Sequence, residues 1–385
     1  MNPIDLKKEI EKAKVVGLNR WLLDALVVAF EDARKNKLKT HDEHKFEANW
    51  MRNIVRLRDT ILAESYRPGG SVAFVVSKPK VREIFAAPFR DRVVHHFLFD
   101  MQAGWWDRRF IQDSYSCRKG KGTLYGIKRA QGKMRAVTNN FTEDAYVFKF
   151  DIKGYFMSLS REKLYERVKW GLDRQFEKYM NDPIGYQIYK ICDFCWRQII
   201  FDDPAKKAHR RGPKYHWDPS YLPPEKSLFA QLFGIGIVIG NLTSQLMSNI
   251  FMDQLDRFIK YELGYKYYGR YVDDFFIMVP KSEVWRVKRD IPRIESFLKD
   301  ELGLEMHKKK RYIQSVYKGM EFLGARIYPR VLYPSDRLQA NFTRALQDVA
   351  YGHKDPQDLV SYLGIMKHLN AKDFVSEKFR KMGWD

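Results

Sequence analysis

Apolar positions in the first 66 residues recur with the period of an amphipathic helix. Two such runs, at residues 21–30 and 46–61, are separated by the polar stretch 35–39, which predicts a loop. The Pro-Gly-Gly sequence that ends at Gly70 predicts the end of the second helix. Residues 1–66 are therefore expected to form a helical N-terminal extension.

After residue 70 the pattern changes to short strands and helices in alternation. Residues 71–77 and 81–86 predict a hairpin with a turn at 78–80, and residues 265–279 predict a second hairpin. The segment 146–150 predicts a strand that leads into Asp151. Helical periods are present at 90–106, 161–179, 184–199, 242–261, 284–301 and in the C-terminal region, and short strands are expected at 312–330. The mixture predicts an α+β fold, in which the Pro- and basic-rich residues 201–226 form a loop insertion.

Charge and composition narrow the class of protein. The 385 residues include 69 Lys+Arg and 48 Asp+Glu, and this net charge of +21 predicts a polyanionic partner. Contents of 45% hydrophobic and 15% aromatic residues exclude a mainly disordered chain. Three cysteines exclude a disulfide scaffold and suit a reducing cytoplasm. We expect neither a secretory signal nor a membrane span from the apolar pattern.

Part of the positive charge gathers in residues 114–142. This stretch holds seven basic and no acidic residues, with four interleaved glycines. So many glycines favour backbone that approaches a phosphate chain over a solvated helix face. The resulting candidates for nucleic-acid binding are Arg118, Lys119, Lys121, Lys128 and Arg129.

Three carboxylates stand in apolar surroundings, where an unpaired charge is costly. Asp151 ends an aromatic strand, and Asp273-Asp274 interrupts an apolar run. Because neighbouring side chains of a strand point to opposite faces, a tight turn that presents both aspartates at its tip is expected. Together the three could bind two divalent cations about 3.5–4 Å apart, an arrangement that stabilises both the attacking and the leaving oxygen of a phosphoryl transfer.

These segments resemble motifs of reverse transcriptases. The string Phe-x-x-Asp-Ile-Lys-Gly-Tyr-Phe around Asp151 is similar to motif A, and Tyr-Val-Asp-Asp, whose first aspartate lies 122 positions later, is similar to motif C. Further matches follow the family's order: fingers motifs at 81–96 and 114–123, motif B at 236–245, motif D at 302–310 and a primer grip at 319–324. The ordered set covers roughly residues 70–330 and is far more specific than an Asp-Asp pair.

The resemblance implies a right-hand polymerase with fingers, palm and thumb. Its expected domains are an extension at 1–66, fingers at 67–140, a palm at 141–284 with an insertion near 201–226, and the end of the palm, primer grip and helical thumb at 285–385. In this family Asp151, Asp273 and Asp274, with the carbonyl of Ile152, would hold two Mg²⁺ ions, with Mn²⁺ as a possible substitute. The primer grip would contain Phe322, Leu323 and Gly324.

The same resemblance assigns roles around the nucleotide. Lys80 and Arg82 would grip the triphosphate, and Tyr155 would lie near the 3′-hydroxyl. Phe156 would exclude a 2′-hydroxyl, so that Phe156→Ala should admit ribonucleotides. Lys310 would donate a proton to pyrophosphate, although Lys308 and Lys309 are alternatives for this role.

Motif B departs from the general pattern of the family. Ile239 stands where most relatives of group II intron type carry Gln, and Gly240 and Asn241 follow it. This pattern is similar to the reverse transcriptases of diversity-generating retroelements, bacterial or phage enzymes that copy a template RNA with errors at adenine and work with a small basic oligomeric accessory protein. Because Ile cannot donate the hydrogen bond of Gln, geometric selection is expected to loosen, and Ile239→Gln should raise fidelity.

Three alternatives stay open. The first is a reverse transcriptase of group II intron or antiphage-defence type, and the second is an RNA-binding scaffold without activity. The third, RNA-templated synthesis of RNA, is disfavoured because Phe156 would exclude a 2′-hydroxyl. A zinc site at Cys192-x-x-Cys195 is disfavoured because no second Cys or His pair follows at a suitable spacing.

Overall fold

The computed structural model describes residues 4–35, 40–77 and 80–384. The chain forms two compact units. Unit 1 comprises Met1–Phe110, Lys153–Gln254 and Lys299–Leu304, and unit 2 comprises Ile111–Ile152, Leu255–Leu298 and Glu305–Asp385. Helices and antiparallel sheets are mixed in the chain, which confirms the predicted α+β class.

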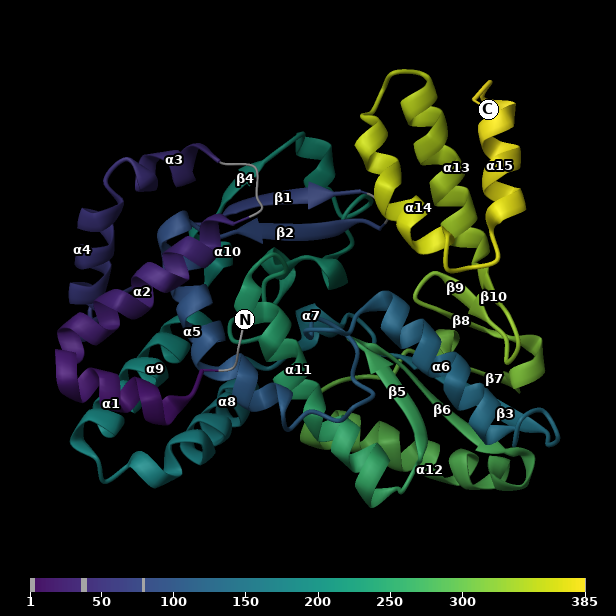
Figure 1. The fold of residues 1–385 in the computed structure, drawn as a ribbon, viewed down its shortest axis with the longest axis horizontal. Helices are drawn as coiled ribbons and strands as arrows, with labels where there is room; N and C mark the ends of the chain where they lie inside the picture. The colour runs from purple at the N-terminus through teal and green to yellow at the C-terminus, as the bar shows by residue number, and fades with distance from the viewer. Residues whose placement is uncertain (1–3, 36–39, 78–79, 385) are drawn as a thin grey trace. The chain divides into compact units, whose positions relative to one another are not determined.

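Unit 1 begins with the predicted helical extension. Its helices are α1 (Leu6–Val16), α2 (Leu18–Arg34), α3 (His41–Glu47) and α4 (Trp50–Leu62), and α5 (Phe89–Asp107) follows (Figure 1). Most of the predicted apolar stripe of α2 is buried, as are Ile54, Leu57 and Ile61 of α4, which confirms these helical periods. The predicted run at 46–61 is divided between two helices, because α3 ends at Glu47 and α4 begins at Trp50. Most of the predicted loop at 35–39 lies outside the described residues.

A three-stranded sheet follows in unit 1. Strands β1 (Val72–Val76) and β2 (Arg82–Ala86) form the predicted antiparallel hairpin, although most of its turn lies outside the described residues. Strand β4 (His209–Arg211) pairs with β1 in parallel, beyond α10 (Pro204–Lys207). The prediction that residues 201–226 form a loop insertion was therefore wrong for the residues of α10 and β4. All three β4 side chains are exposed, so no apolar alternation marks this strand in the sequence.

Three further helices of unit 1 follow the sequence pattern. These are α8 (Arg161–Phe176), α9 (Pro183–Phe201) and most of α11 (Leu242–Arg257), whereas the short helix α7 (Tyr155–Ser158) was not predicted. Cys192 and Cys195 are both buried as free thiols on the inner face of α9, where they pack as small apolar groups.

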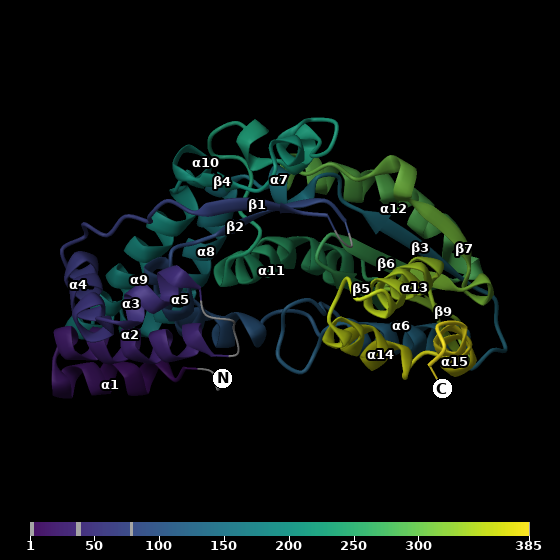
Figure 2. The ribbon, with the colours of Figure 1, turned by 90° about the horizontal axis from the view of Figure 1, so that it is seen from above.

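Unit 2 is built on a four-stranded antiparallel sheet of order β5-β6-β3-β7. The strands are β3 (Ala145–Asp151), β5 (Tyr267–Tyr271), β6 (Asp274–Pro280) and β7 (Tyr312–Ser315). Helix α6 (Thr123–Val137) covers one face and α12 (Val284–Ser296) the other (Figure 2). The central strand β6 is therefore buried on both faces and almost continuously apolar, whereas no residue of the edge strand β7 is buried.

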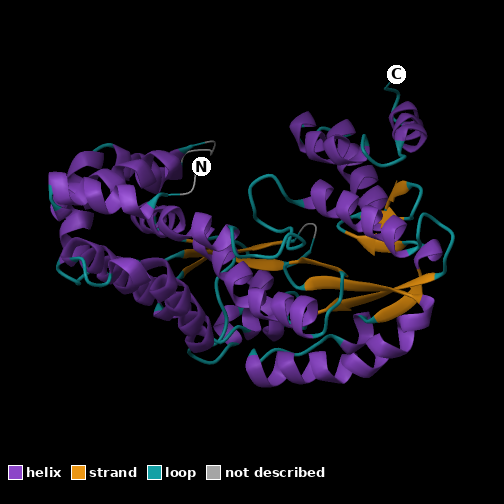
Figure 3. Ribbon diagram, turned by 60° about the horizontal axis from the view of Figure 1, so that its bottom comes forward, coloured by secondary structure: helices purple, strands orange, loops and turns teal. Residues whose placement is uncertain are grey.

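The rest of unit 2 is a small sheet followed by helices. Strands β8 (Met320–Phe322), β9 (Ala325–Ile327) and β10 (Leu332–Pro334) form an antiparallel meander, and α13 (Asp336–Ala350), α14 (Val360–Met366) and α15 (Lys372–Lys381) follow (Figure 3). These helices share a separate apolar core around Phe342 and Leu346. None of the described helices is long and apolar enough to cross a membrane.

Helix α6 corrects the expectation for residues 114–142. The glycine content argued against a helix, yet Ile127, Ala130 and Met134 form its buried stripe. A Cβ on Gly126 would lie 2.8 Å from Leu323 Cδ1 and 3.0 Å from Tyr115 Cδ2. This glycine therefore serves close packing inside a helix, which a composition argument cannot distinguish from a loop.

Candidate active site

The two carboxylate segments meet at one end of the four-stranded sheet. In the antiparallel pairing of β3 with β6, Asp151 is directly opposite Asp274. One residue before Asp151, the ring of Phe150 stacks on Phe275 with centroids 4.9 Å apart. A dry aromatic layer therefore fixes the register that places the two carboxylates side by side.

Asp273 reaches the same end of the sheet through a two-residue turn. Val272 and Asp273 connect β5 to β6, so only Asp273 lies in the turn, whereas Asp274 is the first residue of the strand. Val272 has φ +58°, a left-handed conformation that is costly for a β-branched residue. Hairpin turns usually place glycine at such a position. Strain is therefore concentrated at Val272, which precedes the two aspartates of the Tyr-Val-Asp-Asp segment.

The buried side chain of Arg270 stabilises this turn through hydrogen bonds. Its NH1 donates to the carbonyl oxygen of Val272 at 3.0 Å, and its NH2 donates to Ser114 Oγ at 3.0 Å. The guanidinium also pairs with Asp256 through two bonds of 2.7 Å, and both side chains are completely buried. Tyr268 donates to the same carboxylate at 2.6 Å. The residues that present Asp273 are thus anchored by a desolvated, bidentate ion pair.

Two lysines neutralise the carboxylates at the sheet end. Lys310 Nζ lies 2.8 Å from Asp151 Oδ1, and Lys149 Nζ lies 2.9 Å from Asp274 Oδ2. The segment that carries Lys310 is tied to the end of β3, because the amide of His307 donates to the Asp151 carbonyl at 2.7 Å. Of the three candidate lysines, the structure therefore brings Lys310 to Asp151.

The electrostatics of Asp274 differ from those of an exposed aspartate. Burial raises its pKa to about 6, against the opposing effect of Lys149, and the charges of Asp273 and Asp151 raise it further. Its Oδ1 is buried and has no hydrogen-bond partner among the described residues. Within the same described part of the chain, no three His, Cys, Asp or Glu side chains form a ready-made metal site.

The candidate motif B segment belongs to unit 1, where it packs between two other candidate motifs. The amide of Ile237 donates to the Phe156 carbonyl at 2.9 Å, and the amide of Phe85 donates to the Ile239 carbonyl at 2.9 Å. A Cβ on Gly240 would lie 2.6 Å from the Phe85 carbonyl oxygen, so glycine is required there. Segments far apart in sequence, namely 154–160, 234–241 and the β1–β2 hairpin, thus form one assembly.

The candidate nucleotide residues of this assembly differ in exposure. Phe156 and Ile239 are half-buried against one apolar cluster that also contains Phe85 and Leu228. Tyr155 is buried, and its hydroxyl contacts Ser248 Oγ at 3.0 Å while its ring packs edge-on against Phe156. Tyr155 thereby supports Phe156 from behind.

The remaining nucleotide candidates also lie in unit 1. Asn241 is half-buried beside Gly240, and Lys80 and Arg82 are both exposed at the β1–β2 hairpin. The carboxylates belong to the other unit.

Arg161 supports the motif B segment and was not singled out from the sequence. Its Nε donates to the Gly236 carbonyl at 2.7 Å, and its NH1 donates to the Asp202 carbonyl. It is buried at the first position of α8, where the helix dipole disfavours a cation. An arginine at the first position of a predicted helix is therefore the sequence signal that could have pointed to Arg161.

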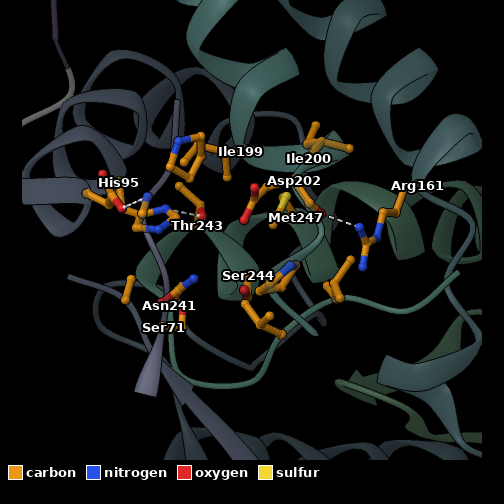
Figure 4. A pocket seen from close by; sticks show the side chains of 17 residues that line it. Ser71, His95, Arg161, Ile199, Ile200, Asp202, Asn241, Thr243, Ser244 and Met247 are labelled. Atoms are coloured by element: carbon orange, nitrogen blue, oxygen red, sulfur yellow. Dashed lines mark hydrogen bonds between the residues drawn. The ribbon is translucent and has the colours of Figure 1, made fainter. Parts of the chain in front are cut away.

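A small cavity with a mixed polar and apolar lining lies behind the motif B segment (Figure 4). Its volume is about 40 Å³, too small for a nucleotide. His95 Nδ1 lies 2.7 Å from Thr243 Oγ1 at the cavity wall, and burial lowers the pKa of His95 to about 3, so that the ring is neutral. We therefore assign the residues that line the cavity to the packing behind the motif B segment and not to a nucleotide site.

The basic candidates of unit 2 are partly engaged within the protein. Arg118 donates to the Ile111 carbonyl at 2.6 Å, Lys121 donates to the Gln112 carbonyl at 2.8 Å, and Arg129 pairs with buried Asp113 at 2.9 Å. Lys119 and Lys128 are exposed. The stretch therefore combines structural cations with exposed ones.

The candidate primer grip of unit 2 is a tight turn between β8 and β9. Phe322 is buried against Phe276 of the large sheet. Leu323 and Gly324 form the turn with φ +55° and +83°. The register of this small hairpin is thus fixed to the sheet that carries the aspartates.

Comparison with known proteins gives limited similarity. No protein-family model matches the chain. No curated protein matches it either. Among solved structures, the chain is similar to telomerase from Candida albicans in complex with the TWJ fragment of telomeric RNA, with 12% identity over 88% of this chain and a TM-score of 0.48. It is also similar to the corresponding complex from Candida tropicalis, with 10% identity over 89% of this chain and a TM-score of 0.47.

The chain spans 59% of the length of each of these two structures. With both TM-scores below 0.5 and both identities at 12% or less, this likeness by itself defines neither the fold nor the function of the chain.

Proposed function

We propose that this chain is an RNA-directed DNA polymerase. The observation that carries the proposal is the register that places Asp151 opposite Asp274, with Asp273 in the adjoining turn. The three carboxylates come from segments 122 positions apart, and bringing them together is opposed by their mutual repulsion. Packing of the sheet alone does not require this placement. A site for nucleotidyl transfer requires that convergence.

In the proposed right-hand arrangement, the four-stranded sheet of unit 2 is the palm, the β1–β2 hairpin belongs to the fingers, and α13 to α15 belong to the thumb. Phe156 and Ile239 would contact the sugar and base of the incoming nucleotide. The exposed Lys80 and Arg82 would bind its triphosphate. The template RNA and the primer would contact exposed cations such as Lys119 and Lys128.

The donor set fits Mg²⁺. Carboxylate oxygens are its preferred ligands, and the buried Oδ1 of Asp274 has no other partner among the described residues. Asp151, Asp273 and Asp274 would hold the ions with the Ile152 carbonyl. Bound Mg²⁺ would polarise the phosphoryl oxygens and neutralise developing charge. Lys310, which already lies against Asp151, would protonate the departing pyrophosphate.

Primer extension on an RNA template with deoxynucleotides and Mg²⁺ tests the proposal. We expect incorporation by the wild-type chain and its loss, by about 10³-fold or more, in Asp273→Asn. Asp144→Asn is the matched control, because Asp144 lies beside the same sheet but is exposed and forms a surface ion pair with Lys281. No incorporation by the wild-type chain, with or without an accessory protein, would favour the RNA-binding scaffold.

The narrower proposal is an error-prone enzyme of a diversity-generating retroelement, working with a small basic accessory protein in the cytoplasm. Ile239 supports it, because its half-buried aliphatic side chain packs in an apolar cluster and offers no hydrogen bond to a nucleotide. Ile239→Gln is expected to lower misincorporation opposite template adenine by about 10-fold, as measured by sequencing the cDNA. Val238→Gln controls for a polar side chain in the same cluster, and equal error rates at adenine in wild type and Ile239→Gln would refute the narrower proposal.

A further inference from the structure

The N-terminal extension contains a groove that shares no residue with the candidate active site. It lies between α3, α4 and the start of α5, entirely within unit 1, and has a volume of about 600 Å³. Four of its lining residues are cationic, and one, Asp42, is acidic. The carboxylate of Asp42 accepts a hydrogen bond from the Phe89 amide, and the four cations outnumber this one negative charge, so the lining is positive overall.

The polar wall of the groove is one face of α4. Asn49, Arg52, Arg56 and Thr60 follow one another at spacings of three and four residues, while Ile54 and Ile61 bury the opposite face. Arg52 and Arg56 are both exposed. Their Cα atoms are separated by about 6 Å along the helix axis, which is on the order of one nucleotide step in an extended strand.

The cations of the groove differ from those of neighbouring helices. Lys12, Arg20 and Arg34 all form ion pairs with acidic residues. Lys45, Arg52 and Arg56 form none within the described part of the chain. Three uncompensated cations that face one groove therefore raise the local concentration of an anionic ligand.

The fourth cation is fixed in place. Arg90 donates to the Arg67 carbonyl at 2.6 Å and to Asp91 at 3.0 Å, and it packs over the Tyr66 ring. Its position at the end of the groove is thus set before any ligand arrives, which lowers the entropy cost of binding there.

We propose that this groove binds the phosphate backbone of single-stranded RNA. Apart from Asp42, the exposed lining side chains are cationic or amide-bearing. Phe46 and Leu57 are buried and Pro88 is half-buried, so the groove offers few exposed apolar side chains to a peptide. A polyphosphate strand needs only spaced cations and hydrogen-bond donors, which Arg52, Arg56 and Asn49 supply. The inference requires that the chain binds RNA and does not depend on polymerase chemistry.

Fluorescence anisotropy with a labelled single-stranded RNA, without primer or nucleotides, tests the proposal on the full chain. The double variant Arg52→Gln/Arg56→Gln is expected to bind about 10-fold more weakly, and its slope of log affinity against log salt should fall by about 1.4. The matched control is Lys8→Gln/Arg20→Gln, which removes two exposed cations outside the groove and should leave both quantities unchanged.

Three results would overturn the proposal. These are an unchanged affinity and salt slope in the double variant, an equal loss in the control, and competition by polyglutamate as strong as that by unlabelled RNA, which would assign the groove to acidic peptides. Primer extension at saturating short template separates this proposal from the polymerase proposal. The double variant should match wild type there, and an inactive wild type that still shows the binding difference would refute only the polymerase.

Discussion

Two carboxylate–cation pairs of unit 2 lie next to the same hairpin turn and differ in almost every physical respect. Asp256 and Arg270, below the turn, are both 0% exposed and share two hydrogen bonds. Asp151 and Lys310, at the end of the sheet, meet through one contact, and the lysine side chain is 51% exposed. The first pair cannot exchange partners without an uncompensated buried charge, whereas the second can. The Asp256–Arg270 pair is thus a rigid base beneath the turn, and Asp151 with Lys310 forms an exchangeable contact at the tip of the sheet. A site for charged substrates requires this arrangement.

Breaking the rigid pair is expected to have the largest effect on stability. Asp256→Asn leaves the Arg270 guanidinium buried without a counter-charge and should reduce the free energy of unfolding by about 3–5 kcal/mol. Urea denaturation followed by circular dichroism measures it. The control Asp144→Asn removes one partner of a pair in which both side chains are more than half exposed, and should cost less than about 1 kcal/mol. A similar loss of unfolding free energy in both variants would show that the buried Asp256–Arg270 pair contributes no more to stability than a surface pair.

Breaking the exchangeable pair should affect activity and spare stability. Lys310→Ala is expected to change the free energy of unfolding by less than about 1 kcal/mol and to slow nucleotide incorporation by about 100-fold. Single-turnover primer extension measures the second quantity. Lys309→Ala is the control, because Lys309 is an exposed neighbour in the same turn of 3₁₀-helix. If Lys309→Ala has the larger effect, the assignment of the proton donor to Lys310 is wrong.

The strained turn that joins the two regions gives the smallest expected effect. Glycine adopts φ +58° without steric cost, so Val272→Gly should leave the protein as stable as before or more stable by up to about 1 kcal/mol. Thermal unfolding measures the change. Val15→Gly, at an exposed position of helix α1, should instead destabilise by about 1 kcal/mol. Destabilisation by both changes to a similar extent would mean that the turn stores no strain.

The sequence predicted the tip of this hairpin better than its base. Strand β3 and the β5–β6 hairpin follow from local apolar patterns, and Asp151, Asp273 and Asp274 stood out as charges in apolar runs. The expectation that both Asp273 and Asp274 occupy the turn failed by one residue, because the register of β6 is fixed by packing such as Phe150 on Phe275. Turn boundaries depend on that pairing and not on local propensity.

Other features depend on contacts that no local pattern records. Asp256 is one of two acidic residues of helix α11, and only the tertiary structure shows that it pairs with Arg270. Arg270 itself, a charge inside a buried strand, was a signal that could have been read. Strand β4 has no apolar pattern, since it forms only by adding backbone hydrogen bonds to the edge of β1. Helix α6 was missed because Gly126 permits close packing against Tyr115.

The binding of Mn²⁺ at the tip tests the central claim most directly, namely that the three aspartates form one metal-dependent centre. Electron paramagnetic resonance would measure it in the presence of an RNA template, a dideoxy-terminated primer and the matching deoxynucleotide. We predict that Asp151→Asn and Asp273→Asn each weaken Mn²⁺ binding by at least about 10-fold relative to wild type, and that the exposed control Asp144→Asn does not. Equal binding in wild type and both tip variants would contradict the account.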